Sequence, residues 1–377
     1  MKSNYKKLGE FIRTVDIRNR ENRELELLGV SVEKCFIKSI ANTVGTDWCN
    51  YKIIKKSQFC YIPDTSRRGD KIGVALLSEF DEALVSQAYT VFEVVDKNLI
   101  LPEYIMLWFK RPEFDRYARY HSQGSVREIF DWEEMCNVEL PVPEIEEQQK
   151  IVNSYKAIEN RISILRQIND NLESQILTIF NNKFEPLNDN LTGQYKLTDY
   201  FTFGNGYAFS SEDYLSSGKY KIITIKNVND GYINTNNVNY LDQISNKVEK
   251  VAKLNLNDIV ISLTGNVGRT AIITENNLLL NQRVAKIQPK DIYYHGFLYA
   301  LFRHPKTKLF LKGISKGTAQ ANLSPVEVLQ LKVNYEPNDI ICFSKCIQPI
   351  IKSIINNNLE LKELGVLLNT FISLLSH

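Results

Sequence analysis

The sequence predicts an α+β protein with two similar globular domains separated by two long antiparallel coiled-coil helices. Two observations indicate this arrangement: segments recur at a nearly constant offset, and a long heptad pattern follows each copy. The expected parts are a first domain (1–144), a first long helix (145–185), a second domain (186–336) and a second long helix (337–377).

The duplication is most visible in short matching motifs. Residues 108–112 (WFKRP) resemble residues 301–305 (LFRHP), at an offset of 193. The same offset aligns 123–125 (QGS) with 316–318 (KGT). A single short match is expected by chance, but several matches in one order indicate a repeated domain.

Each copy shows the same order of expected elements. Strand-like runs rich in Val, Ile and Leu are interrupted by Gly, Asn and Pro, and lie at 27–32, 91–95, 221–226 and 258–263. A helical stretch and a last strand then follow, at 103–120 with 138–142 and at 296–311 with 330–333. This order predicts a compact α+β domain in each copy. The glycine-containing run 203–206 predicts a turn rather than a cofactor loop.

The segments 151–179 and 347–375 carry apolar residues at alternating steps of three and four, as in a coiled-coil seam. Each seam contains one interior asparagine, Asn169 and Asn357. An antiparallel alignment that pairs these two residues fills the other layers with apolar side chains, whereas a slide by one heptad strands each amide against an aliphatic group. The seam therefore predicts one register. The alternative is that each amphipathic helix packs only on its own domain.

The charge of the chain is nearly balanced, with 46 basic and 44 acidic residues and a net charge of +2. Two local basic stretches stand out, the first 24 residues and residues 303–316. Such stretches are typical of phosphate-binding surfaces, although solvated basic faces have the same composition.

Six cysteines without a Cys-x-x-Cys pair favour buried free thiols over a metal site. We find no signal peptide and no 18-residue apolar run, and we expect a cytoplasmic protein without membrane contact.

The motifs of the expected enzymes are missing from the sequence. There is no Pro-Pro pair for an amino-methyltransferase loop, and residues 265–270 (GNVGRT) lack the lysine of a phosphate loop. Four scattered histidines do not form a catalytic constellation. We therefore expect a binding protein with no catalytic residues, no metal and no cofactor of its own.

Several motifs resemble the specificity subunit of type I restriction–modification enzymes. Residues 140–143 (LPVP) with 147–152 (EQQKIV) look like the start of that family's central helix. Residues 109–114 (FKRPEF) and 124–129 (GSVREI) are similar to segments of its first domain, and 264–269 (TGNVGR) and 281–283 (NQR) to its other common recognition domain. The resemblance covers essentially the whole chain. One departure is NDIIC at 338–342, where a second Glu-Gln-x-x-Ile start would stand.

The resemblance implies a function for each part. Each domain would recognise one half of a bipartite double-stranded DNA target, and the helices would set the gap between the halves. Two modification subunits would use S-adenosylmethionine to methylate adenine, and restriction subunits would use ATP and magnesium to translocate and cut. Two alternatives remain: a coiled-coil scaffold that recruits proteins without recognising bases, and an enzyme with a degenerate nuclease or methyltransferase site.

Candidate DNA contacts follow from polar, basic and glycine-containing loops. Arg67 and Arg68 are candidates for bidentate contact with guanine, and the alternative is an exposed turn. The glycine loops of both copies are candidates too, although a structural helix-to-strand turn explains them nearly as well. Arg18, Arg20 and Arg23 suit phosphates better than bases. The full set is Arg18, Arg20, Arg23, Ser66, Arg67, Arg68, Lys71, Gln123, Ser125, Arg127, Thr264, Asn266, Arg269, Gln282, Arg283, Lys316, Thr318 and Gln320.

Overall fold

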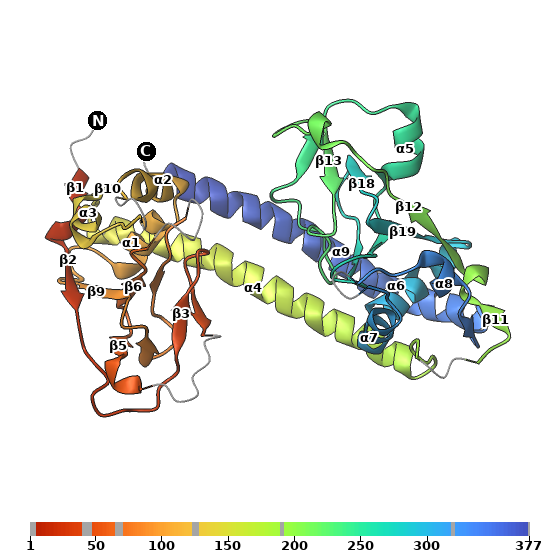
Figure 1. Cartoon of the computed structure of the whole chain (residues 1–377), viewed down its shortest axis with the longest axis horizontal. Coiled ribbons are helices and arrows are strands. Elements are labelled where there is room, and N and C mark those ends of the chain that lie inside the picture. The colour runs from red at the N-terminus through yellow and green to blue at the C-terminus, as the bar shows by residue number, and fades with distance from the viewer. Residues whose placement is uncertain are drawn as a thin grey trace. The chain divides into compact units, whose positions relative to one another are not determined.

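The computed structural model describes residues 5–39, 47–64, 71–122, 128–188, 192–317 and 321–375. The chain divides into two compact units, Met1–Ile162 with Leu364–His377, and Ser163–Glu363. Each unit holds one α+β domain and a part of the two long helices, α4 (Ile145–Asn181) and α9 (Pro337–Leu374) (Figure 1). Within the described ranges, every helix is too short or too polar to cross a membrane.

The first unit is built around a four-stranded antiparallel sheet. Its strand order is β2 (Ile12–Val15), β9 (Thr90–Val94), β6 (Phe59–Tyr61), β7 (Val74–Leu76). Three strand pairs accompany it: β1 (Tyr5–Lys7) with β10 (Glu139–Pro141), β3 (Leu28–Val30) with β4 (Phe36–Lys38), and β5 (Lys52–Lys55) with β8 (Glu82–Val85). Its helices are α1 (Pro102–Phe109), α2 (Pro112–Tyr120) and α3 (Trp132–Asn137).

The second unit repeats this plan. Its corresponding sheet has the order β12 (Phe201–Asn205), β19 (Val284–Pro289), β16 (Ile259–Ser262), β17 (Thr270–Ile272), and β11 (Tyr195–Lys196) pairs with β20 (Lys332–Val333). A further sheet runs β14 (Asn239–Leu241), β13 (Tyr220–Ile223), β18 (Leu278–Leu280), β15 (Lys253–Leu254). The helices are α5 (Asn246–Ala252), α6 (His295–Arg303), α7 (Pro305–Gly313) and α8 (Pro325–Leu329). The matching strand orders confirm the predicted duplicated α+β fold.

Two local predictions are wrong. The helical stretches 103–120 and 296–311 are each divided into two helices, because Pro112 and Pro305 lack the N–H of a helix interior and begin new helices instead. Residues 203–205 of the expected turn are in fact the last residues of β12. Gly206 follows this strand and lies so close to the segment between β18 and β19 that a Cβ would sit 2.1 Å from the carbonyl oxygen of Asn281, so the glycine serves close backbone approach.

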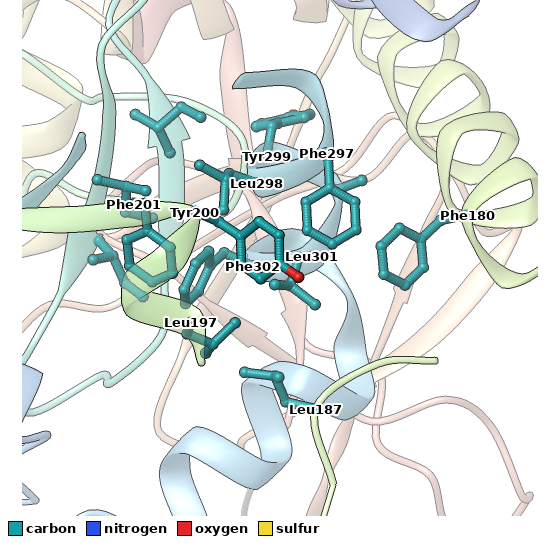
Figure 2. Packing of buried hydrophobic residues seen from close by; sticks show 14 of the residues in the cluster. Phe180, Leu187, Leu197, Tyr200, Phe201, Phe297, Leu298, Tyr299, Leu301 and Phe302 are labelled. Atoms are coloured by element: carbon teal, nitrogen blue, oxygen red, sulfur yellow. The ribbon is translucent and has the colours of Figure 1, made fainter. Parts of the chain in front are cut away.

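The core of the second unit is dense with aromatic side chains. Figure 2 shows Phe297, Leu301 and Phe302 of α6 beside Tyr200 and Phe201. Phe180, near the end of α4, belongs to the same cluster, and its ring stacks on Phe297 with centroids 5.7 Å apart. The end of the long helix is therefore part of the domain core and not only of the helix seam. In the first unit, Val152 and Tyr155 of α4 and Ile372 of α9 are likewise buried with the domain.

The cysteines differ from the prediction of buried thiols. Cys60 is fully buried, and burial raises the pKa of its thiol. Cys35, Cys342 and Cys346 are exposed, so the prediction is wrong for these three. Cys342 and Cys346 lie one turn apart on α9, on the side that does not pack against the core.

The contacts between α4 and α9 are those of the antiparallel alignment. In the second unit, Asn357 Nδ2 donates to Asn169 Oδ1 at 2.7 Å, and Asn169 Nδ2 donates to Asn358 Oδ1 at 3.0 Å. In the first unit, the rings of Tyr155 and Phe371 lie 6.0 Å apart. Both Asn169–Asn357 and Tyr155–Phe371 belong to the one alignment that the seam spacing favours. The amides therefore satisfy each other within an otherwise apolar seam.

The repeated motif around residues 110 and 303 joins each domain to α4. Lys110 Nζ donates to Tyr155 Oη at 3.0 Å and to Glu159 at 2.8 Å. Arg303, at the equivalent position of the second copy, makes a bidentate pair with Glu173. Burial alone lowers the pKa of Arg303, but hydrogen bonds and charge from Glu173 outweigh it and raise the pKa. Both copies thus use a cation at the end of their first helix to hold a glutamate of the same long helix.

The start of α4 has a structural role in its own domain. Gln148 is fully buried, accepts the backbone N–H of Leu101, and donates to the carbonyls of Leu99 and Pro143. In the second unit Ser344 Oγ accepts the N–H of Phe297, in the first turn of α6. Each long helix therefore satisfies a backbone donor at the start of a helix of its domain, α1 or α6. Because α9 starts with a different sequence, the acceptor there is a serine, Ser344, at another position of the helix instead of a glutamine.

The asparagine layer predicts a measurable contribution to stability. Asn357→Ala leaves Asn169 Oδ1 without its donor and should lower the free energy of unfolding by about 1 kcal/mol in urea titrations. The control is Asn356→Ala, since Asn356 is exposed one residue earlier on the same helix and makes no such contact with any described residue. Equal effects of the two substitutions would contradict this role of the layer.

Candidate nucleic-acid interface

In the first unit, several candidate residues follow strands that end at one edge of the central sheet. Strands β2 and β6 are both antiparallel to β9, so they run in the same direction and end at the same edge. Val15 and Cys60 are both paired with Val91, which places the two strand ends at the same level. Arg18 and Arg20 follow β2, and Lys71 closes the loop after β6. Arg23 instead contacts Glu82, which is paired with Lys55 just before the start of β6, so it lies away from this edge.

A second loop joins this edge. Asp64, after β6, forms a β-bridge with Ile129, and the N–H of Phe130 donates to the carbonyl of Pro63 at 2.9 Å. These contacts place the residues that flank the two candidate loops next to each other. The loop residues themselves lie outside the described ranges: Ser66, Arg67, Arg68, Gln123, Ser125 and Arg127.

The second unit has the same edge. Strands β12 and β16 are both antiparallel to β19, and Asn205 and Ile261 are both paired with Ala285. Gln282 and Arg283 lie directly before β19 at this edge. Its loop residues Thr264, Asn266 and Arg269 follow β16, and Lys316 lies on the neighbouring segment.

The same backbone contacts also hold the second pair of loops. Thr264 forms a β-bridge with Asn322, and the N–H of Leu323 donates to the carbonyl of Leu263 at 2.8 Å. Asn322 and Leu323 are the residues that the repeat offset aligns with Ile129 and Phe130. Thr318 and Gln320 lie outside the described ranges. The structure therefore brings the described loop candidates of each copy to equivalent edges.

The loop 264–269 is held by its own backbone contacts. Ser262 Oγ accepts the N–H of Arg269 at 3.1 Å and donates to the carbonyl of Asn266. Gly265 and Gly268 have φ values of +68° and +81°, which disfavour other residues. Val267 is buried and anchors the turn in the core. Asn266 is consequently exposed, and Arg269 is partly exposed, on a preformed loop.

A polar hollow opens at this edge. It is lined by Leu263, Thr264, Gln282, Arg283 and Asn322. Thr264 Oγ1 is buried and has no hydrogen-bond partner among the described residues. Because buried hydroxyls are normally paired, this atom is suited to a polar group supplied by a ligand. Hydrogen-bonding side chains around such a hollow are the groups that contact base edges and phosphates in DNA complexes.

Many of the candidate cations are already paired with carboxylates. Arg18 lies 3.0 Å from Asp16, Lys71 lies 2.9 Å from Glu33, and Arg23 contacts Glu82. The hydrogen bond from Arg23 lowers the pKa of Glu82. Lys316 contacts Glu327. These pairs weaken the local positive potential and require exchange of partners before phosphate binding.

The basic stretch 303–316 is a poorer phosphate surface than its composition suggests. Arg303 is largely buried between Glu173 and Asp230, and Lys308 is paired with Asp230. Lys306 and Lys312 are exposed and, among the described residues, lack a carboxylate partner. Arg20 and Arg269 also lack a carboxylate partner within the described ranges, so they are available for a ligand.

Sequence reasoning missed a buried ion pair beside the first loop. Lys34 and Asp115 are both largely buried, with 2.6 Å between Nζ and Oδ1. The same carboxylate oxygen accepts the N–H of Ile72 at 3.1 Å, next to Lys71. Burial lowers the pKa of Lys34 although Asp115 opposes this effect. The repeat offset that aligns residues 112 and 305 also aligns Asp115 with Lys308. The sequence alone could therefore have marked this charged position as common to both copies.

The fold and the two edges define a class of protein: a duplicated α+β binding protein with paired long helices. Comparison with known families identifies it further. The profile of the type I restriction modification DNA specificity domain matches residues 2–174 and again 192–366. The chain belongs to this family.

Individual relatives are more distant. The specificity subunit of the type I restriction enzyme MjaIX of Methanocaldococcus jannaschii is 24% identical over 293 residues, which cover 71% of this chain and 66% of that protein. The HindI specificity subunit of Haemophilus influenzae is 26% identical over 135 residues, or 35% of this chain and 29% of that protein. The aligned parts thus span just under two thirds and under one third of these relatives.

A solved structure shares the fold over the whole chain. The crystal structure of a type I restriction–modification system S subunit from M. genitalium superimposes with a TM-score of 0.55 at 14% identity. The match covers 99% of this chain and 96% of that one.

The buried pair predicts a strong effect of a single substitution. Asp115→Asn leaves the ammonium of Lys34 buried without a counter-charge and should lower the free energy of unfolding by about 3 kcal/mol. The control is Arg116→Gln on the same helix, where an exposed pair with Glu113 contributes about 0.5 kcal/mol or less. Denaturant titration distinguishes them, and a small effect of Asp115→Asn would refute the ion-pair argument.

Proposed function

We propose that this chain is the DNA-specificity subunit of a type I restriction–modification complex. Each domain recognises one half of a bipartite double-stranded DNA target at its sheet edge. The observation that carries the proposal is the equivalence of the two edges within a member of this family. In both copies, the residues that flank the candidate loops meet at the ends of two strands that run in the same direction.

The paired helices suit the role of a spacer. Both α4 and α9 pass from one unit into the other, and an α-helix advances about 1.5 Å per residue. A layer of amides that fixes one register makes the pair a defined connection. We therefore assign the gap between the two half-targets to the length of these helices.

We assign the chemistry to partner subunits. Two modification subunits would bind S-adenosylmethionine and methylate adenine, and restriction subunits would use ATP and magnesium to translocate and cleave DNA. This chain would provide no catalytic residue and bind no cofactor, and the complex would act in the cytoplasm. A scaffold that recruits partners without recognising bases is disfavoured by the Thr264 hydroxyl at the polar hollow, which is buried and has no hydrogen-bond partner in the described part of the chain.

The test of function is a genome-wide map of methylated adenines in cells with and without this chain. The expected result is a bipartite motif that is methylated only when the chain is present. A purified complex should select the same motif from a random duplex library. Identical methylation maps together with no selected motif would overturn the proposal.

Separate roles are expected for Arg269 and Lys312. Arg269→Ala removes a partly exposed guanidinium from the preformed loop and should reduce the preference for the selected target over random DNA by about tenfold. Lys312→Ala removes an exposed cation of α7. This substitution should at most weaken binding to all DNA sequences alike, and it should lower the salt dependence of the affinity. Competition binding at several salt concentrations measures both, and equal loss on both DNAs for Arg269→Ala would reduce it to a phosphate contact.

A further inference from the structure

Four side chains of alternating charge connect α4 to the recognition edge of the second domain. Glu173 of α4 holds Arg303 in a bidentate pair. Arg303 Nη1 donates to Asp230 Oδ1 at 2.9 Å, and the other oxygen of Asp230 accepts from Lys308 of α7. The exposed fractions of the Arg303 and Glu173 side chains are 11% and 19%, so water screens this part of the chain only weakly.

Lys308 contacts the loop 264–269, and the turn that contains Asp230 is hydrogen-bonded to the strand that follows this loop. A Cβ placed on Gly268 would lie 3.2 Å from Cγ of Lys308, so the lysine stem supports the loop directly. The N–H of Gly231 donates to the carbonyl of Thr270 at 2.9 Å, and Thr270 Oγ1 donates to the carbonyl of Gly268 at 3.2 Å. The position of Asp230 is therefore linked to Gly268, the neighbour of Arg269.

The same turn also contacts the helix pair. Asn358 Nδ2 donates to the carbonyl of Gly231 at 3.4 Å, and Asn358 Oδ1 accepts from Asn169. The turn at 230–231 thus lies between the asparagine layer and the strand that follows the loop. Ionic and amide contacts converge on it from α6, α7 and α9, and α4 is joined to it through Arg303 and Asn358.

The first domain has a related arrangement with the opposite charge. Asp115 is aligned with Lys308 by the repeat offset, and both are the fourth residue of their helix. Asp115 binds Lys34 and the N–H of Ile72, at the root of the first loop. Because an aspartate repels phosphate, a shared role of this position in both copies is support of the loop and not contact with the DNA backbone.

We infer that Asp230 is a positioning residue for recognition by the second domain. By binding Arg303 and Lys308 together, it holds the loop 264–269 in a fixed orientation on α4. This inference rests on the proposed function. It leads to an unusual expectation: removal of a negative charge near the DNA should weaken recognition of the target instead of strengthening it.

The experiment uses the full-length chain, with Asp230→Asn compared to Asp213→Asn. Asp213 is exposed in the same domain and has no ion pair within the described residues, so both variants lose one negative charge. Binding is measured on the duplex selected by the unsubstituted chain and on duplexes altered in one or the other half. For Asp230→Asn, discrimination should fall by about tenfold at one half only. Binding to random DNA should not weaken, and Asp213→Asn should retain discrimination at both halves.

Two further variants separate positioning from general damage. Asp230→Glu retains the charge and should recover most of the discrimination. Lys308→Met keeps the stem against Gly268 but removes the ion pair, so it should lose discrimination at the same half as Asp230→Asn. Unchanged discrimination in Asp230→Asn, or an equal loss at both halves, would overturn the inference. Absence of any sequence preference in the unsubstituted chain would overturn the proposed function itself, and the inference with it.

Discussion

The hydrogen-bonded asparagine layer is the interaction on which the arrangement of the helix pair depends. Aliphatic layers pack almost equally well after a slide of one heptad, but amides buried against aliphatic groups lose their hydrogen bonds. Asn169 and Asn357 satisfy each other in one alignment. Once that alignment is set, each glutamate of α4 has a fixed position relative to α9. Glu159 and Glu173 can then serve as docking points for Lys110 and Arg303.

In the second unit, the contacts that hold the domain on α4 also support the loop 264–269. Arg303 contacts α4 through Glu173 and the turn of Asp230 on its other side. That turn is hydrogen-bonded to β17, which directly follows the loop. The exposed part of the loop is consequently small, and it is held by buried anchors such as Val267. A rigid support of this kind suits the proposed recognition edge, because side chains that contact a ligand are then held in one geometry.

Much of this organisation could be predicted from the sequence. The duplication, the long helices and the pairing of Asn169 with Asn357 follow from offsets and spacing, because periodicity reports directly on burial. The split of each helical stretch at Pro112 and Pro305 follows from the chemistry of proline, which favours the first turn of a helix over its interior. The convergence of loops at a sheet edge was not predictable, since it depends on which strands are neighbours.

The electrostatic part was the least predictable. A basic stretch in the sequence carries no information about its partners, and Glu173 and Asp230 lie far from Arg303 along the chain. Arg303 therefore resembled a phosphate ligand but is a docking residue. Cysteine is usually buried, and we expected Cys35, Cys342 and Cys346 to be buried as well. They are exposed because they lie on faces that do not pack against a core.

The central claim is that the helix pair sets the gap while the two edges set the bases. The direct measurement is target selection from a random duplex library by a variant with one additional heptad in each long helix. The insertions belong after Ile162 in α4 and after Glu363 in α9, where the chain passes between the units. The account predicts the same two half-motifs separated by a longer gap. An unchanged gap, or altered bases in either half-motif, would contradict it.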